Sequence, residues 1–124
     1  MVRRAAKVDA NQTEIVDAFR SMGVSVLITS SAGDGFTDLV IGWGGITVLV
    51  EVKDGNKAPS ERKLTPKQQD LHTSFLGAIT VVENTDQAIE LVNRIRLIAG
   101  HVNANWQLTG DKEQCRTILQ TCCA

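Results

Sequence analysis

The segment Val48-Leu-Val-Glu-Val-Lys constrains the fold of this chain most, because it alternates like a β-strand and yet carries two charges. Strand alternation places the three valines on one face and Leu49, Glu51 and Lys53 on the other. A carboxylate and an ammonium group in an otherwise apolar strand are costly unless they are paired or bound to a metal ion. The segment therefore predicts a buried valine face and a polar site at one end of a sheet.

A second carboxylate lies on the preceding strand-like run, Gly35-Phe-Thr-Asp-Leu-Val-Ile-Gly. The connection Gly42-Trp-Gly-Gly is rich in glycine and suits a hairpin turn. If the two strands pair, Asp38 and Glu51 converge at one end of the sheet. Hard carboxylate oxygens suit Mg²⁺ or Mn²⁺. The pattern therefore predicts a divalent-metal site with Lys53 beside it.

Periodicity and capping signals divide the chain into helices and strands. An apolar stripe that includes Ile15 and Phe19 predicts the first helix, and Thr65 before Pro66 predicts the N-cap of the second, which we expect to bury Leu71 and Phe75. Thr85 is expected to cap the third helix. The expected helices cover about residues 9–22, 66–76 and 86–99, and the strands about 24–29, 36–42, 46–53 and 78–83. This order predicts an α/β domain with a mixed four-stranded sheet flanked by helices.

Length and charge set further limits. A chain of 124 residues forms one domain, and a net charge of −1 gives no whole-molecule attraction to nucleic acid. The segment after the charged strand is nonetheless locally basic, with Lys53, Lys57, Arg62, Lys63 and Lys67 against Asp54 and Glu61. A solvated loop is the simpler explanation of these charges; a phosphate-binding surface is the alternative.

No signal peptide and no apolar run of membrane-spanning length occur, so we expect a cytoplasmic protein of a bacterium or a phage-infected cell. Cys115, Cys122 and Cys123 are odd in number and bunched, which is typical of free thiols in a reducing compartment. A short helix within 111–121 is conceivable in the tail, whose packing the sequence does not reveal.

Asp38, twelve intervening residues and then Glu51-Val-Lys53 resemble the motif of the PD-(D/E)xK nuclease superfamily. More narrowly, the chain is similar to the VRR-NUC branch and to small stand-alone phage-type nucleases. The extended match includes Val8-Asp-Ala-Asn-Gln-Thr-Glu-Ile-Val and Pro59-Ser-Glu-Arg-Lys-Leu-Thr-Pro-Lys-Gln. The resemblance implies a restriction-endonuclease-like core in residues 1–99, with 100–124 as an extension packed on the same domain or on a dimer partner.

The resemblance also implies roles for the central residues. Asp38 and Glu51 would ligate Mg²⁺ or Mn²⁺ together with the backbone carbonyl of Val52. Lys53 would position or activate the attacking water and offset charge at the scissile phosphate. The family usually has a proline where this chain has Thr37, and that proline shapes the strand without taking part in the chemistry.

Two helix residues complete the implied catalytic set. Glu14 matches the first-helix glutamate that lies next to the metal, and Gln68 matches a polar residue that faces the active site. Both positions also suit ordinary solvated helix residues, and His72 on the second helix is read as structural. Contacts with DNA are expected from Lys57, Arg62, Lys63 and Lys67.

The resemblance predicts a metal-dependent DNA endonuclease, structure-selective and resolving four-way junctions as a homodimer. The small size agrees with structure selectivity, because little surface is left for reading sequence. The alternatives are a less selective phage or mobile-element nuclease or nickase, and a junction-binding module with a vestigial site. Trp43, in the expected hairpin, would stack on a base or pack on its own domain or a partner subunit.

Overall fold

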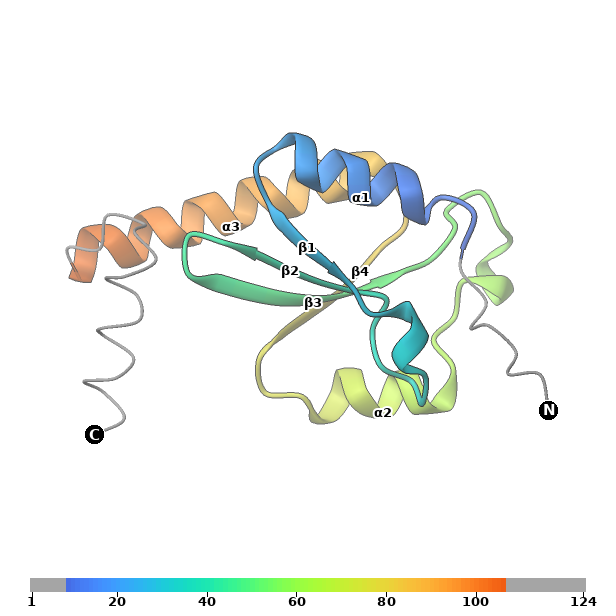
Figure 1. Cartoon of the computed structure of the whole chain (residues 1–124). Coiled ribbons are helices and arrows are strands. Elements are labelled where there is room, and N and C mark those ends of the chain that lie inside the picture. The colour runs from blue at the N-terminus through green and yellow to red at the C-terminus, as the bar shows by residue number, and fades with distance from the viewer. Residues whose placement is uncertain (1–8, 107–124) are drawn as a thin grey trace.

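A computed structural model of the protein describes residues 9–106, and the side chains up to residue 100. The elements follow the order helix, three strands, helix, strand, helix, as the sequence predicts (Figure 1). The helices are α1 (Gln12–Ser21), α2 (Pro66–Ser74) and α3 (Thr85–Trp106), and the strands are β1 (Ser25–Ile28), β2 (Leu39–Trp43), β3 (Ile46–Val52) and β4 (Ala78–Val82). Short 3₁₀ turns occur at η1 (Ser30–Ala32) and η2 (Pro59–Glu61).

The four strands form one mixed sheet in the order β1-β2-β3-β4. β1 pairs with β2 and β2 with β3 in antiparallel fashion, whereas β3 and β4 are parallel. The chain can reach β4 in parallel only through a crossover, and α2 together with its preceding loop provides it. The predicted α/β class and the mixed four-stranded sheet are thus confirmed.

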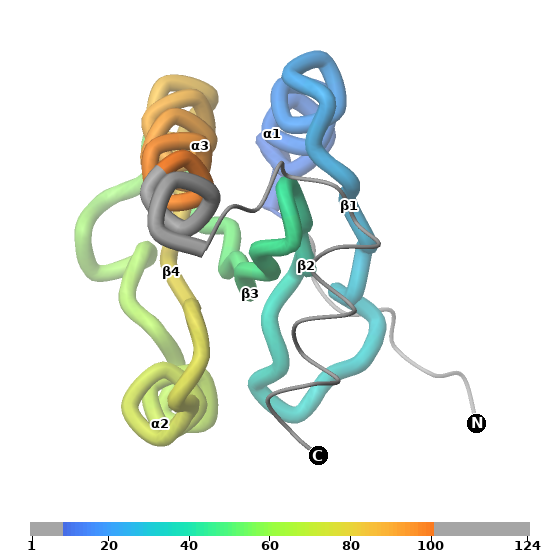
Figure 2. Tube along the Cα trace, turned by 90° about the vertical axis from the view of Figure 1, so that its left-hand side faces the viewer, coloured from blue at the N-terminus to red at the C-terminus, as the bar shows by residue number. Residues whose placement is uncertain are grey.

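The core lies between the sheet and the helices α1 and α3, which run side by side on one face (Figures 1 and 2). The valines of β3 point into this layer, where they meet the apolar stripe of α1. Ile15 and Phe19 are both 0% exposed, so the helical periodicity read from the sequence identifies the packed face correctly. The buried core residues of the described part are Ile15, Val16, Phe19, Val24, Leu39, Ile41, Val48, Val50, Val52, Val82, Ala88, Val92 and Ile95.

Helix α2 lies alone on the opposite face (Figure 2). It starts as predicted: the Thr65 side chain accepts a hydrogen bond from the Gln68 amide, and the Gln68 side chain accepts one from the Thr65 amide. The expectation that this helix buries Leu71 and Phe75 is wrong, because α2 has no buried residue and Phe75 is 40% exposed. The sequence of α2 is mostly polar and has no continuous apolar stripe to bury.

The β2–β3 hairpin turns at Gly44 and Gly45, which have φ of 58° and 82°. Positive φ at both positions fits the tight hairpin turn that the glycine-rich connection predicts. Trp43 precedes the turn and packs against the core, with the Arg96 guanidinium 5.6 Å from its ring centre. The side chain is therefore engaged with its own domain.

Helix α3 differs from the prediction at both ends. Asn84, and not Thr85, caps its N-terminus: Oδ1 of Asn84 accepts a hydrogen bond from the Gln87 amide at 2.8 Å. Thr85 is already the first residue of the helix. The helix continues beyond the expected end near residue 99, to Trp106. Among residues 9–106, no helix combines the length and the apolar character needed to cross a membrane. The three cysteines and the conceivable tail helix lie outside the described residues.

Candidate functional site

Strand pairing brings Asp38 and Glu51 together. Leu39 lies opposite Val50 in the antiparallel β2–β3 ladder, so the preceding residue, Asp38, lies beside Glu51. The Val52 amide donates a 2.9 Å hydrogen bond to Oδ2 of Asp38. The predicted convergence of the two carboxylates is therefore present, on the face of the sheet that α2 covers (Figure 1).

The loop that precedes Asp38 is also well ordered by hydrogen bonds. Thr37 is 0% exposed, and its hydroxyl donates to the Leu39 carbonyl at 3.2 Å. Thr29 supports the same segment, because its hydroxyl donates to the Thr37 carbonyl at 2.7 Å and its amide donates to the Asp38 carbonyl at 2.7 Å. The hydroxyl and the carbonyl of this buried threonine are therefore both hydrogen-bonded.

Glu51 is almost completely buried, with 2% exposure. The Gln68 side-chain amide donates to its Oε1 at 2.9 Å, whereas its buried Oε2 has no hydrogen-bond donor among the described residues. Burial, repulsion from the Asp38 carboxylate and a hydrogen bond with Asp38 raise the pKa of Glu51 to about 8, although Lys53 acts in the opposite direction. The two carboxyls therefore need a proton or a cation between them.

Lys53 is 9% exposed and also contacts Gln68: its Nζ donates to Oε1 of Gln68 at 2.9 Å. The same oxygen accepts from the Thr65 amide at 2.9 Å. Gln68 thus closes the N-terminus of α2 while it bridges Glu51 and Lys53. The structure brings together four of the residues predicted for the site: Asp38, Glu51, Lys53 and Gln68.

The structure does not bring Glu14 to these carboxylates. Glu14 is exposed and lines a separate hollow of about 150 Å³ with Asn11 at the start of α1 and with residues of the loops that follow β3 and β4. The reason is helical geometry: Glu14 is adjacent to the buried Ile15, so it points about 100° away from the core-facing side. Gln12, three positions before Ile15, is the polar residue that this side of α1 buries.

Sequence reasoning missed three residues at the start of α1. Gln12 is 6% exposed, donates to the Ser30 hydroxyl at 3.4 Å and has a buried Oε1 with no partner among the described residues. Asn11 donates to the carbonyls of Lys53 and Glu83, at 3.1 and 2.8 Å. Asp9 contributes to the raised pKa of Glu51. The segment containing them belongs to the quoted family match, and reading it at helical spacing from Ile15 would have singled out Gln12.

Three of the four expected DNA contacts are engaged in ion pairs. Lys57 pairs with Asp9 at 3.5 Å, Lys67 with Asp34 at 3.3 Å and Arg62 with Glu83 at 2.6 Å. Arg62 and Glu83 are both less than a third exposed, so this pair ties the loop to the end of β4. Lys63 is exposed, and within residues 9–106 no ion pair involves it.

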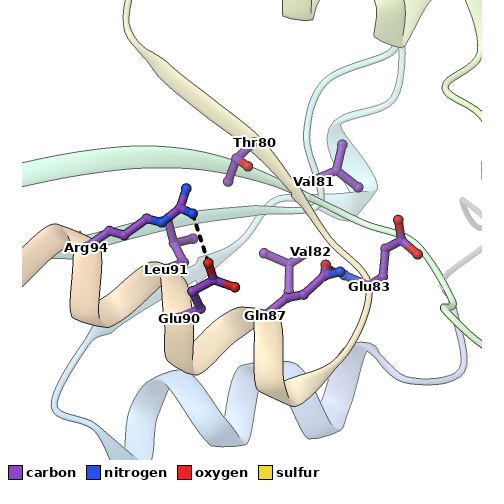
Figure 3. Close-up of a pocket in the computed structure, with 8 residues that line it drawn as sticks. All are labelled: Thr80, Val81, Val82, Glu83, Gln87, Glu90, Leu91 and Arg94. Atoms are coloured by element: carbon purple, nitrogen blue, oxygen red, sulfur yellow. Dashed lines mark hydrogen bonds and ion pairs between the residues drawn. The ribbon is translucent and has the colours of Figure 1, made fainter.

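A hollow of about 560 Å³ opens beside Asp38, between the loop that follows β1 and the first turn of α2. A different hollow, of about 280 Å³, lies between β4 and α3 (Figure 3). Its charged residues are already paired, Arg94 with Glu90 at 2.8 Å and Glu83 with Arg62. The hollow beside Asp38 is the one of these two that includes a carboxylate of the candidate site.

His72 on α2 also lies near the site. Burial lowers the pKa of His72, and the positive charge of Lys53 lowers it further.

Among residues 9–100, no three His, Cys, Asp or Glu side chains are grouped closely enough to hold a metal ion by themselves. Two carboxylates nevertheless suffice for Mg²⁺, which keeps several waters and takes further ligands from substrate phosphate. Comparison of the chain with protein-family models, with curated proteins and with solved structures gives no match.

Proposed function

We propose that this protein is a metal-dependent endonuclease that hydrolyses phosphodiester bonds of DNA. The observation that carries the proposal is the cluster of Asp38, Glu51, Lys53 and Gln68 at one end of the sheet, where two facing carboxylates lie beside a nearly buried lysine. Carboxylate pairs of this kind are costly in a structural role, because each raises the energy of the other's charged form. A perturbed pKa next to an open hollow is typical of functional sites.

The donor set fits Mg²⁺ or Mn²⁺. Oε2 of Glu51 is buried without a hydrogen-bond donor, and the Asp38 carboxylate beside it repels it. A divalent cation held by Asp38 and Glu51 would remove both the unsatisfied oxygen and the repulsion. The resemblance also names the Val52 carbonyl and Glu14 as ligands, but no unsatisfied atom supports either of them, and Glu14 lines a different hollow from Asp38.

Lys53 and Gln68 would have different roles in the hydrolysis. When bound, the cation supplies Lewis-acid stabilisation of phosphate charge and lowers the pKa of a coordinated water. Lys53 would contribute a positive charge beside the phosphate and orient the attacking water, which forms a bond to phosphorus and gives up one proton to solvent while the P–O3′ bond breaks. The leaving 3′ oxygen takes up a proton from solvent. Gln68 holds Lys53 and Glu51 in fixed relation by its two hydrogen bonds.

We propose branched DNA, and four-way junctions in particular, as the preferred substrate. The support is the resemblance of Asp38 and Glu51-Val-Lys53 to the motif of small nucleases that act on branched DNA. Symmetric resolution of a junction requires two active sites related by a two-fold axis, so the proposal includes a homodimer.

Cleavage of labelled four-way junction, flap, duplex and single strand in Mg²⁺ or Mn²⁺ tests the proposal, with Glu51→Ala as the inactive control. Paired nicks at the junction that disappear in the variant would support a dimeric resolving enzyme. Cleavage of every substrate would support the less selective nuclease. Tight junction binding without cleavage, under both metals, would contradict an enzymatic function and favour a binding module.

A further inference from the structure

The hollow beside Asp38 has an aromatic wall. Its lining comes from two segments, the loop after β1 and the first turn of α2, with Asp38 at the edge of the sheet between them. Phe36 is 39% exposed and belongs to this lining, although it directly precedes a fully buried residue, Thr37. The exposed part of its ring is therefore available to a molecule that enters the hollow.

The backbone keeps this wall in place. Gly33, Asp34 and Gly35 have φ of 71°, 54° and 78°, so three successive residues adopt the left-handed region. Gly35 lies so close to α2 that a Cβ on it would be 2.7 Å from Cβ of Lys67. The Phe36 amide closes the turn by donating to the Gly33 carbonyl at 3.0 Å. The loop is thus docked on the helix, and the position of the Phe36 ring follows from it.

The hollow also offers polar groups at its rim. Ser30 and Thr65 belong to its lining, and their hydroxyl groups accept hydrogen bonds from Gln12 and from the Gln68 amide, which leaves each hydroxyl proton free to be donated. The exposed Lys67–Asp34 ion pair, 3.3 Å long, borders the hollow. A volume of about 560 Å³ is within the range of small-molecule pockets and holds one nucleotide unit, but not a stacked base pair with its flanking sugars.

We infer that this hollow receives one unstacked nucleobase of the DNA strand that is cut, with Phe36 as its stacking surface. The inference rests on the proposed function, because it assumes that the scissile phosphate lies at Asp38 and Glu51. A phosphate at that position places the base of an adjoining nucleotide near the Phe36 side of the site. Aromatic side chains stack on any base, whereas the hydroxyl groups can bind its edge. The substrate class that follows is DNA with an unpaired nucleotide at the cut.

A binding measurement separates this inference from cleavage. The full chain labelled with 4-fluorophenylalanine contains three reporters, Phe19, Phe36 and Phe75, which single variants assign in a ¹⁹F spectrum. In Mg²⁺, dAMP is expected to shift the Phe36 signal, whereas 2-deoxyribose 5-phosphate, which has no base, leaves it in place. Phe75 is the matched reporter, because it is 40% exposed and does not line the hollow. A Phe36 signal that moves equally with both probes, or with neither, would overturn the inference.

Cleavage of modified junctions gives the second test. An abasic nucleotide next to the cut is expected to slow the wild-type protein and Phe75→Ala by about 5- to 100-fold, the range for loss of one base stack. Phe36→Ala is expected to be slow on the normal junction and insensitive to the missing base, and Phe36→Tyr to restore the wild-type pattern. Cleavage that is indifferent to the base and to Phe36 would overturn the inference and leave the proposed nuclease intact. A Phe36 shift with dAMP in a protein that cuts no DNA would support base binding and contradict the nuclease.

Discussion

The backbone amide of Val52 donates a 2.9 Å hydrogen bond to Oδ2 of Asp38, so the strand that carries Glu51 also holds the opposing carboxylate. The distance between the two acids is consequently determined by sheet register more than by side-chain rotamers. A pair held so firmly cannot relieve its repulsion by moving apart. This rigidity leads to the first prediction.

Asp38→Asn is expected to fold normally and to lose cleavage by about 100-fold or more. The asparagine oxygen still accepts from the Val52 amide, whereas the negative charge needed by a cation is gone. Circular dichroism and junction cleavage in Mg²⁺ measure the two properties, with Asp17→Asn as a control at an exposed carboxylate of α1. Full activity of Asp38→Asn would exclude Asp38 as a metal ligand.

The metal-free protein is expected to lose stability as the pH rises. Glu51 has a pKa of about 8 in the folded chain and an ordinary value of 4.5, so between these values the folded state holds a proton that the unfolded state has lost. The free energy of unfolding therefore falls from about pH 4.5 to pH 8. Thermal melts in EDTA across this range measure the effect.

Glu51→Gln removes the titrating group and keeps an oxygen for the Gln68 amide. We expect its melting temperature in EDTA at pH 8 to exceed that of the wild type by several degrees, since about 1 kcal/mol corresponds to about 4–8 °C in a domain of this size. The exposed Glu61→Gln is the control. A wild-type melting temperature that rises from pH 5 to pH 8 would refute the raised pKa.

Gln68→Ala is expected to weaken the start of α2 and the site at once. Loss of the capping box costs about 1 kcal/mol, and loss of the bonds to Glu51 and Lys53 is expected to slow cleavage by about 10- to 100-fold. Gln69→Ala is the neighbouring control, because the only hydrogen bond of the Gln69 side chain in the described structure goes to Thr73 on the same helix. Equal effects of the two variants on cleavage would mean that Gln68 acts only through helix stability.

Gly35→Ala is expected to destabilise the fold by about 2 kcal/mol or more, because it adds both left-handed strain and a clash with the backbone of Lys67, 2.8 Å from the new Cβ. Gly23→Ala has the same φ of 78° with no atom within 4 Å, so it isolates the strain, about 1 kcal/mol. Urea denaturation compares the two. A smaller loss for Gly35→Ala than for Gly23→Ala would show that the loop does not dock on α2.

Lys63 and Arg62 are adjacent and are expected to behave differently. Lys63→Ala is expected to leave the melting temperature unchanged and to reduce the salt dependence of DNA binding by about one counterion. Arg62→Ala breaks the 2.6 Å pair with Glu83 and is expected to lower stability instead. Titrations of a labelled junction at several salt concentrations, with melts of both variants, distinguish the roles. A salt slope unaffected by Lys63→Ala would remove this residue from the DNA contacts.

The sheet and the central pair follow from local patterns. The alternation of residues in Val48–Lys53 predicts which face of the strand is buried, and the glycine-rich turn predicts the hairpin. Together these two features place Asp38 beside Glu51. Thr65 before Pro66 likewise gives the start of α2. These features depend on neighbours in sequence, which is why the sequence alone predicts them.

What the sequence does not predict depends on how separate elements meet. Whether Gln12 or Glu14 is buried depends on which side of α1 faces the sheet. Phe75 stays partly exposed because no further element covers the outer side of α2. The pairing of Lys57 with Asp9 joins segments that are far apart in the chain. Phe36 acquires its position only when its loop docks on α2.

Helix α2 has no buried residue, and its attachment to the sheet runs through Gln68, which at the same time bonds Glu51 and Lys53. An element with so little apolar burial belongs to the part of a protein that opens locally while the rest stays folded. Each such opening would withdraw Gln68 and leave the acid pair and the lysine without their common partner. The fraction of molecules with an assembled site would then be set by the equilibrium between the closed and the locally open state of α2. Hydrogen exchange of the backbone amides in Pro66–Ser74 measures this equilibrium directly.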